Sequence, residues 1–384
     1  MKIGLFSDTF RPQINGVTTV LETLDRVFTR MGHEIYLFVP AYESHRASSD
    51  GKVFRFPAIP VLYGKESRFA IPRSPAAKRI FSQLDVLHSH TPFSLGVLAI
   101  RVAHKYERPH VHTYQTLFTD YLHFLPRYLR PTRRMIERIS ASFCNHCDAI
   151  TTPSRPMRDL LLSYGIAKPV YSLPFGLDMA DFAHPMEHHL RTELQLPADD
   201  HLLICAGRVS HEKNIAFVLR AFRQMLTREP RIYLIIVGDG PARLDLESEA
   251  RALGLSERAI FTGYMNRAKL IDYYKDADLF VYGSKTETQG IVYCEALASG
   301  TPVVAVGEMG VLDVVEDGVT GLLLPEDEAA FAEVTVSLLH DPERRRHMSE
   351  AAVRSAQEQS AERSCERLLE VYQSLLKIPT SLTT

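Results

Sequence analysis

Two short segments in the second half of the chain concentrate charged side chains where an apolar run passes into a helical pattern. The first, residues 207–214, reads Gly-Arg-Val-Ser-His-Glu-Lys-Asn and carries two cations, Arg208 and Lys213. Cations beside the unpaired backbone N–H groups of a helix start are suited to binding a diphosphate. The alternative is a solvated turn in which Glu212 pairs with a neighbouring cation.

The second segment contains two glutamates, Glu287 and Glu295, separated by seven residues. A helix that starts near Gly290 would leave Glu287 in the preceding loop and place Glu295 inside the helix, toward the same side. One carboxylate would then bond sugar hydroxyls and the other a ribose diol, while the amides of Gly290 and Ile291 hold phosphate. The alternative is that Glu287 only caps the helix and that Glu295 is solvated.

Short apolar runs alternate with longer helical patterns along the chain, as in repeated βαβ units. We predict strands over residues 2–6, 34–39, 85–89, 109–113, 149–152, 202–206, 232–237, 259–261, 279–281, 302–305 and 321–324. We predict helices over residues 16–31, 94–106, 131–146, 214–226, 241–253, 267–276, 290–298, 326–339, 343–357 and 361–376, the third beginning with Pro131. The continuous apolar strands favour parallel sheets buried on both faces. The pattern predicts an α/β fold with two doubly wound domains and a ligand crevice where strand carboxyl ends converge.

Length and composition agree with this organisation. A chain of 384 residues with 45% hydrophobic and 23% charged side chains is globular, and its length predicts two domains. We place the first at residues 1–175 and the second from residue 176 to residue 360. Five cysteines, an odd number, do not form a disulfide framework in a chain of this size, so we expect reduced thiols.

The charge is distributed unevenly. Residues 1–180 contain 23 Lys and Arg against 14 Asp and Glu, a net charge of +9, whereas residues 181–384 contain 21 against 32, a net charge of −11. This asymmetry indicates an anionic partner for the first half only, either nucleic acid or an anionic lipid surface. No nucleic-acid-binding motif is recognisable, which favours the lipid.

Two stretches of the first half, residues 61–80 and 114–138, interleave aromatic or apolar side chains with basic ones. Such a pattern suits an anionic lipid interface, and the alternative is a solvated basic face with ordinary core aromatics. The predicted acceptor and membrane contacts include Tyr114, Phe118, Tyr121, Arg127, Arg130, Arg133 and Arg134. No apolar stretch is long enough to span a bilayer, so we expect a cytoplasmic protein that is peripheral on the inner face of the cell membrane.

Several motifs together resemble glycosyltransferase family 4, whose members are retaining enzymes of GT-B fold. The resemblance covers roughly residues 2–360 and rests on Gly207 with Arg208 and Lys213, the Glu287–Glu295 pair, Pro174-Phe175-Gly176-Leu177-Asp178, Val237-Gly238-Asp239-Gly240-Pro241 and the opening Ser7-Asp8-Thr9-Phe10-Arg11-Pro12-Gln13-Ile14-Asn15-Gly16-Val17. Within the family, residues 13–17, 112–116 and 286–290 look most like the bacterial diacylglycerol α-glucosyltransferases.

The resemblance implies two Rossmann-like domains that face a deep cleft. The first would bind acceptor and membrane, the second would bind the nucleotide sugar, and residues 361–384 would cross back toward the first domain. The expected donor is UDP-glucose and the expected acceptor is 1,2-diacylglycerol. No cofactor is expected.

The resemblance also implies roles for individual residues. Arg208 and Lys213 would bind the donor diphosphate, Glu287 would orient the sugar, and Glu295 would hold the ribose. The full set of expected donor contacts is Gly16, Arg208, Lys213, Tyr264, Met265, Glu287, Thr288, Gln289, Gly290, Ile291 and Glu295, with the backbone at Tyr264 and Met265 reading the base. His112, Arg208, Lys213 and Glu287 would be catalytic, with His112 beneath the donor sugar, and Asp8 would join the acceptor contacts. The family often has two adjacent glycines where this chain has Asn15-Gly16.

A retaining transfer through an oxocarbenium-like transition state needs charge stabilisation and positioning more than it needs a strong base. Metal-dependent nucleotide-sugar enzymes usually place an Asp-x-Asp on a loop. The match here, Asp276-Ala277-Asp278, lies where a predicted helix meets a strand, so we interpret it as structural and expect no metal requirement. The His88/His90 and His110/His112 pairs lack an evident third ligand and are weak metal-site signals.

The sequence alone leaves alternative functions open. One is mannosyl transfer from GDP-mannose to a soluble or polyprenyl-linked glycan, and others are a nucleotide-sugar epimerase and a non-catalytic nucleotide-sugar binder. Gly238-Asp239-Gly240 is similar to a dinucleotide fingerprint, but Arg243 stands where the third glycine would be, which disfavours hydride transfer.

Overall fold

The computed structural model describes residues 1–13, 15–42, 51–60, 68–118 and 130–376. Contacts divide the chain into unit 1, Met1–Gly176 with Ala361–Thr384, and unit 2, Leu177–Ser360. Leu177 and Ser360 pair through a parallel bridge, so the chain enters and leaves unit 2 at adjacent points. Each unit is built on one parallel sheet, which confirms the predicted fold class.

The sheet of unit 1 has the order β3-β2-β1-β6-β7-β8-β9. Its strands are β1 (Lys2–Phe6), β2 (Glu34–Pro40), β3 (Val53–Phe56), β6 (Val86–Ser89), β7 (His110–Thr113), β8 (Ala149–Thr152) and β9 (Val170–Ser172). A separate antiparallel pair joins β4 (Ala58–Pro60) to β5 (Arg68–Ala70). The order reverses between β1 and β6, which makes their carboxyl ends the switch point of this sheet.

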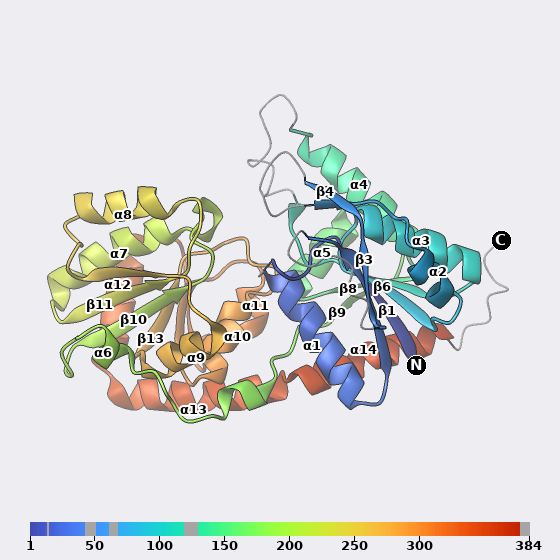
Figure 1. The fold of residues 1–384 in the computed structure, drawn as a ribbon. Helices are drawn as coiled ribbons and strands as arrows, with labels where there is room; N and C mark the ends of the chain where they lie inside the picture. The colour runs from blue at the N-terminus through green and yellow to red at the C-terminus, as the bar shows by residue number, and fades with distance from the viewer. Residues whose placement is uncertain (14, 43–50, 61–67, 119–129, 377–384) are drawn as a thin grey trace. The chain divides into compact units, whose positions relative to one another are not determined.

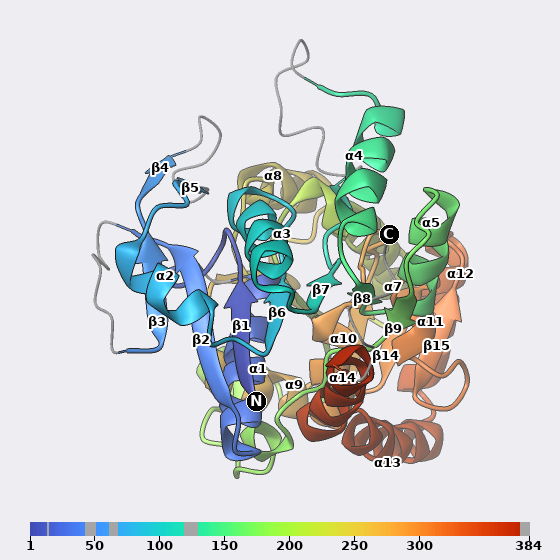
Figure 2. The ribbon, with the colours of Figure 1, turned by 90° about the vertical axis from the view of Figure 1, so that its right-hand side faces the viewer.

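The helices of unit 1 are α1 (Gly16–Arg30), α2 (Pro75–Phe81), α3 (Ser94–Tyr106), α4 (Arg133–Asn145), α5 (Arg155–Ser163) and α14 (Ala361–Leu376). Helix α14 lies beside α1 (Figure 2). Its buried Tyr372 bonds His88 of β6, with 2.5 Å between the hydroxyl oxygen and Nδ1. The last helix is therefore anchored in the core of the first unit.

The start of α4 differs from the prediction. Thr132 caps the helix by accepting a hydrogen bond from the Met135 amide, so Pro131 precedes the cap and does not occupy the first helical position. The sequence pattern also missed β3, β4, β5, β9, α2 and α5. These strands have only three or four residues, which is too short for a period to be recognised.

The sheet of unit 2 has the order β12-β11-β10-β13-β14-β15. Its strands are β10 (His201–Ala206), β11 (Ile232–Val237), β12 (Ala259–Gly263), β13 (Leu279–Tyr282), β14 (Val303–Val306) and β15 (Gly321–Leu324). All six were predicted within one or two residues. The order reverses between β10 and β13, so the loops that follow these two strands meet at the switch point.

Helices cover both faces of this sheet, with α7, α8 and α12 on one face and α9, α10 and α13 on the other (Figure 1). The helices are α6 (Leu190–Glu193), α7 (Ile215–Arg228), α8 (Arg243–Ala252), α9 (Arg267–Asp276), α10 (Ile291–Ala298), α11 (Val311–Val314), α12 (Glu328–Leu339) and α13 (Pro342–Glu358). One buried apolar cluster runs through the sheet and these helices. The burial of strands on both faces explains their continuous apolar sequences.

The five cysteines are free thiols, and all are buried. Within the described ranges, no helix combines the length and the apolar character needed to cross a bilayer.

Candidate active site

The two charged segments found in the sequence meet at the switch point of unit 2. Lys213, in the turn after β10, donates to Glu287, in the loop after β13, with 2.6 Å between Nζ and Oε1. Only 15% of the Lys213 side chain and 13% of the Glu287 side chain are exposed. A largely desolvated cation is thus held at strand carboxyl ends, where open α/β sheets bind ligands.

Asn214 ties the Lys213 turn to the neighbouring strand. It follows the short 3₁₀ turn His211–Lys213 in the left-handed conformation, with φ 53°, which asparagine tolerates better than most residues. Its Nδ2 donates to the Gly283 carbonyl at the end of β13, 3.1 Å away, and to Glu326. This anchoring places Lys213 opposite Glu287.

The conformation of the Glu287 loop is fixed by a backbone hydrogen bond and by a glycine. The Glu287 carbonyl accepts a hydrogen bond from the Gly310 amide, 2.9 Å away. Gly290 has φ +80°, and a Cβ there would lie 2.3 Å from Tyr293 Cδ2, so glycine is required for both conformation and space. Gln289 is buried and its amide contacts the Cys294 thiol, while Thr288 and Ile291 are half-buried.

Helix α10 begins directly after Gly290 without a side-chain cap. Glu287 therefore does not act as the cap that the alternative interpretation required. The first amides of an uncapped helix carry partial positive charge, which is suited to a phosphate. The loop of Glu287 thus has Lys213 as an ion-pair partner and leads directly into this uncapped helix start, which supports an anion site at the loop.

Glu295 is buried in the second turn of α10, contrary to the interpretation of a solvated helix residue. Its carboxylate lies 3.2 Å from Nε of Arg267, the first residue of α9, and 10% of the side chain is exposed. Burial raises the pKa of Glu295, and the positive charge of Arg267 opposes this increase. The sequence did not indicate Arg267 as the partner of Glu295. The two residues are 28 positions apart, and no local sequence pattern links them.

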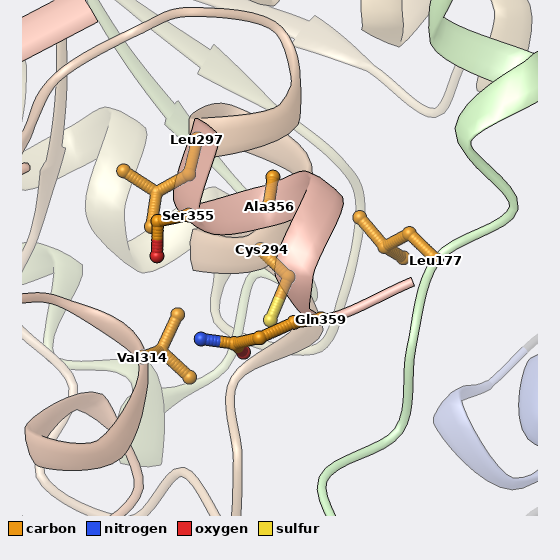
Figure 3. A pocket seen from close by; sticks show the side chains of 7 residues that line it. All are labelled: Leu177, Cys294, Leu297, Val314, Ser355, Ala356 and Gln359. Carbon is orange, nitrogen blue, oxygen red and sulfur yellow. The ribbon is translucent and has the colours of Figure 1, made fainter. Parts of the chain in front are cut away.

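A small pocket in unit 2 lies between α10, α11 and α13 (Figure 3). It is lined by Leu177, Cys294, Leu297, Val314, Ser355, Ala356 and Gln359, and it contains none of the predicted donor contacts. Helix α10 is thus packed against α13 on this side.

The remaining donor residues predicted in unit 2 lie in loops after β10 and β12. Arg208 is exposed in the turn that carries Lys213, and Tyr264 is 62% exposed directly after β12. Met265 packs against the apolar core. All three follow strand carboxyl ends, on the same edge of the sheet as Lys213 and Glu287.

The Gly238-Asp239-Gly240 motif allows the loop after β11 to approach the Arg208 turn. A Cβ on Gly238 would lie 1.9 Å from the Gly207 carbonyl oxygen, and one on Gly240 would lie 2.3 Å from that of Val209. The close approach of the two backbones therefore explains why glycine occupies both positions, and no dinucleotide-binding role is needed to explain them.

The predicted site residues of unit 1 lie on several different elements. Gly16 is exposed at the first position of α1, after Asn15, which caps the helix by accepting from the Thr18 amide. Ile14, in the same motif, lies outside the described residues.

Asp8 is buried and accepts hydrogen bonds from Thr91, Ser94 and the Leu95 amide at the start of α3. Burial raises its pKa, and these hydrogen bonds oppose the increase. Its carboxylate stabilises the start of α3, and its role as an acceptor contact stays a prediction.

His112 lies on β7 and is 1% exposed. Ser89 Oγ lies 2.8 Å from both His112 Nδ1 and His110 Nε2, and His112 Nε2 is buried without a hydrogen-bond partner in the described structure. On the opposite face, His88 bonds Tyr372 and Thr113 through its two ring nitrogens. Four of these ring nitrogens, His88 Nδ1, His88 Nε2, His110 Nε2 and His112 Nδ1, thus contact hydroxyl groups.

Burial lowers the pKa of all four histidines, His88, His90, His110 and His112. For His90 and His110 it lowers the pKa to about 3. All four rings are therefore neutral at neutral pH.

The predicted membrane contacts divide into exposed and buried groups. Tyr114 is 2% exposed, and its hydroxyl bonds Ser140. Phe118 is half-buried against Tyr114 and Phe93. Arg130, Arg133 and Arg134 are exposed, whereas Tyr121 and Arg127 lie outside the described residues.

The sequence matches two family models, "Glycosyltransferase Family 4" over residues 14–181 and "Glycosyl transferases group 1" over residues 187–355. It is 34% identical over 354 residues to the alpha-monoglucosyldiacylglycerol synthase of Streptococcus pneumoniae, covering 90% of this chain and 80% of that protein. The chain belongs to glycosyltransferase family 4. A protein of the same name from Acholeplasma laidlawii is 29% identical, covering 88% of each chain.

Solved structures share the fold of this glycosyltransferase. The Anabaena protein HepE in complex with UDP superposes with a TM-score of 0.78 at 20% identity, over 97% of this chain and all of that one. Sucrose-phosphate synthase of Thermosynechococcus elongatus gives a TM-score of 0.77 at 21% identity, over 97% of this chain and 98% of that one. The GT-B architecture that the motifs implied is confirmed.

The two aspartates of the Asp-x-Asp motif in this glycosyltransferase bond groups of the chain itself. Asp276 accepts from the Arg191 amide, and Asp278 accepts from the Leu202 amide and pairs with the Arg191 side chain. Across the described part of the chain, no three His, Cys, Asp or Glu side chains are grouped as a metal site requires.

The neutral histidines predict a pH-dependent stability. An unfolded histidine titrates near pH 6.5 and the folded ones titrate far lower, so the unfolded state binds more protons between these values. The free energy of unfolding should therefore fall as pH decreases below about 6.5, by up to about 1.4 kcal/mol per pH unit for each buried histidine.

Calorimetric unfolding at pH 8, 7, 6 and 5 measures this dependence. His110→Asn should reduce the slope, whereas replacement of the exposed His347 by Gln should not. Equal stability of the wild-type protein at pH 7 and pH 5 would contradict the prediction.

Proposed function

We propose that this enzyme transfers glucose from UDP-glucose to 1,2-diacylglycerol with retention of configuration. The largely buried Lys213–Glu287 pair at the switch point of unit 2 supports this proposal most directly, because it provides a largely desolvated cation beside a carboxylate and an uncapped helix start. Two relatives named alpha-monoglucosyldiacylglycerol synthase support the choice of substrates. Solved neighbours were crystallised with UDP and with UDP-glucose.

A second candidate is mannosyl transfer. A GDP-mannose-dependent alpha-mannosyltransferase of Mycobacterium tuberculosis is 29% identical over 98% of this chain and 97% of that one. The identity of 34% to the Streptococcus pneumoniae enzyme, against 29% to this mannosyltransferase, and the exposed apolar and basic surface of α4 favour a lipid acceptor over a soluble glycan.

We infer the following roles in unit 2. Lys213, Arg208 and the amides of Gly290 and Ile291, at the start of α10, bind the diphosphate and stabilise the negative charge that develops as it leaves. Glu287 then exchanges its bond to Lys213 for hydroxyls of the sugar. Glu295 accepts hydrogen bonds from the ribose, and the backbone at Tyr264 and Met265 contacts the base. Thr288 and Gln289 shape the loop that carries Glu287.

Cationic side chains perform here the role that a metal ion has in other nucleotide-sugar enzymes, so we expect no metal requirement. In unit 1, we infer that His112 acts as a neutral hydrogen-bonding group toward the sugar and that Gly16 admits the phosphates close to the backbone. The departing phosphate takes the acceptor proton, because the site has no evident strong base.

Helix α4 supports peripheral binding to anionic lipid. Met135 and Ile139, one turn apart, are 51% and 61% exposed, and the exposed Arg134 and Arg138 flank them at the same spacing. Apolar side chains that enter the acyl boundary beside cations at the headgroups are typical of interfacial helices. We infer that this surface binds the cytoplasmic face of the membrane and gives access to the lipid acceptor.

Incubation with UDP-glucose, UDP-galactose and GDP-mannose in turn, with diacylglycerol in micelles that contain phosphatidylglycerol, tests the function. We expect an α-linked glucosyl lipid from UDP-glucose, with activity maintained in EDTA. A mannosyl lipid, or donor hydrolysis without a lipid product, would contradict the proposed substrates. Loss of activity in EDTA that Mg²⁺ or Mn²⁺ restores would contradict metal independence.

Lys213→Met should lower kcat about 100-fold or more, because one preorganised charge is removed from the leaving diphosphate. Lys285→Met is a matched control, since Lys285 also pairs with a glutamate at 2.6 Å but is 39% exposed, and it should retain nearly full activity. Comparable kcat values for Lys213→Met and the wild-type enzyme would show that Lys213 does not stabilise the leaving diphosphate.

The double variant Met135→Ser/Ile139→Ser should bind phosphatidylglycerol vesicles several-fold more weakly, because two apolar anchors are lost. Its affinity for UDP should not change. Leu244→Ser, at a leucine of unit 2 that is 78% exposed, provides the control for a general loss of apolar surface. Equal co-sedimentation of the double variant and the wild-type protein with vesicles would rule out this face of α4.

A further inference from the structure

The guanidinium of Arg267 is fixed between three groups of unit 2. Its Nε lies 3.2 Å from Glu295 Oε1, its Nη1 lies 3.1 Å from Asp181 Oδ2, and its Cζ lies 5.7 Å from the centre of the Phe182 ring. Asp181 and Phe182 belong to the short 3₁₀ helix Met179–Phe182, which Asp178 caps. Arg267 therefore joins α9, α10 and the segment by which the chain enters unit 2.

Glu295 needs such a partner because it is buried. Desolvation favours the neutral carboxylic acid, which donates one hydrogen bond and loses acceptor capacity. An ionised carboxylate accepts two hydroxyl hydrogen bonds side by side, which matches the adjacent 2′ and 3′ hydroxyls of a ribose. The nearby positive charge of Arg267 counteracts the desolvation of Glu295.

The contact leaves the acceptor sites of Glu295 available. Arg267 Nε has no aligned hydrogen-bond partner among the described residues, so the guanidinium acts on Glu295 as a neighbouring charge. The positive charge of Arg267 thus favours the ionised carboxylate, and its contact with Oε1 leaves lone pairs of the carboxylate for a ligand. Asp181 and Phe182 hold the cation in place when a ligand takes up those lone pairs.

We propose that Arg267 is a positioning residue that keeps Glu295 ionised and oriented for the ribose of the nucleotide. This inference rests on the proposed function, because it assigns the ribose to Glu295. Arg267 itself need not touch the nucleotide, which distinguishes its role from those of Lys213 and Arg208.

Calorimetric titration with two nucleotides, UDP and 2′,3′-dideoxy-UDP, tests the inference. Arg267→Met and Glu295→Gln should each weaken UDP binding at least tenfold, and both should bind dideoxy-UDP as the wild-type enzyme does. Arg267→Lys, which retains a cation, should recover part of the loss. An altered fold would weaken both nucleotides, so the comparison separates positioning from a structural defect.

Arg258→Met is a matched control. Arg258 also pairs with a buried carboxylate, Asp200, at 3.0 Å and lies 4.6 Å from the Tyr233 ring centre, with 33% of its side chain exposed against 32% for Arg267. It precedes β12, at the amino end of the strand, so its loss should leave the binding of both nucleotides unchanged.

The outcomes separate this inference from the proposed function. If Glu295→Gln discriminates between the nucleotides and Arg267→Met does not, the positioning role is wrong and the ribose assignment stands. Equal weakening of both nucleotides by Arg267→Met would also overturn the positioning role. If Glu295→Gln binds UDP as tightly as the wild-type enzyme, the ribose assignment fails and the inference fails with it.

Discussion

The ion pair between Lys213 and Glu287 is the contact on which the rest of the site depends. It joins the loops that follow β10 and β13, at the point where the strand order of unit 2 reverses. Because both side chains are largely removed from water, each charge requires a partner, and loss of one would leave the other uncompensated. Asn214, Gly283, Gly290 and Gly310 have conformations or contacts that serve this meeting of the two loops.

The same principle applies to both glutamates of the site. Glu287 is paired with a lysine that an anionic ligand can take over, whereas Glu295 is paired with an arginine held by two further groups. The first pair is suited to exchange on ligand binding, and the second is suited to remain. Preorganised charges of this kind stabilise a departing diphosphate without reorganisation at the moment of reaction.

The sequence predicted the site well where the charged residues lie next to a recognisable local pattern of strand, loop or helix. The strands of unit 2, the loop position of Glu287 and the helical position of Glu295 followed from apolar runs and glycine positions. Arg267 could not be predicted, because its relation to Glu295 arises from the packing of α9 against α10 and not from a helical period. The burial of Tyr114 and Asp8 could not be predicted for a related reason, since neither aromatic spacing nor a motif shows whether a side chain faces the core.

The location of the donor site in unit 2 is the central claim, and hydrogen exchange of backbone amides with and without UDP tests it most directly. The account predicts that UDP slows exchange in peptides that cover residues 207–214, 263–267 and 287–295, while peptides from the middle of α12 exchange as before. Unchanged exchange in these three segments at saturating UDP, with protection elsewhere, would contradict it.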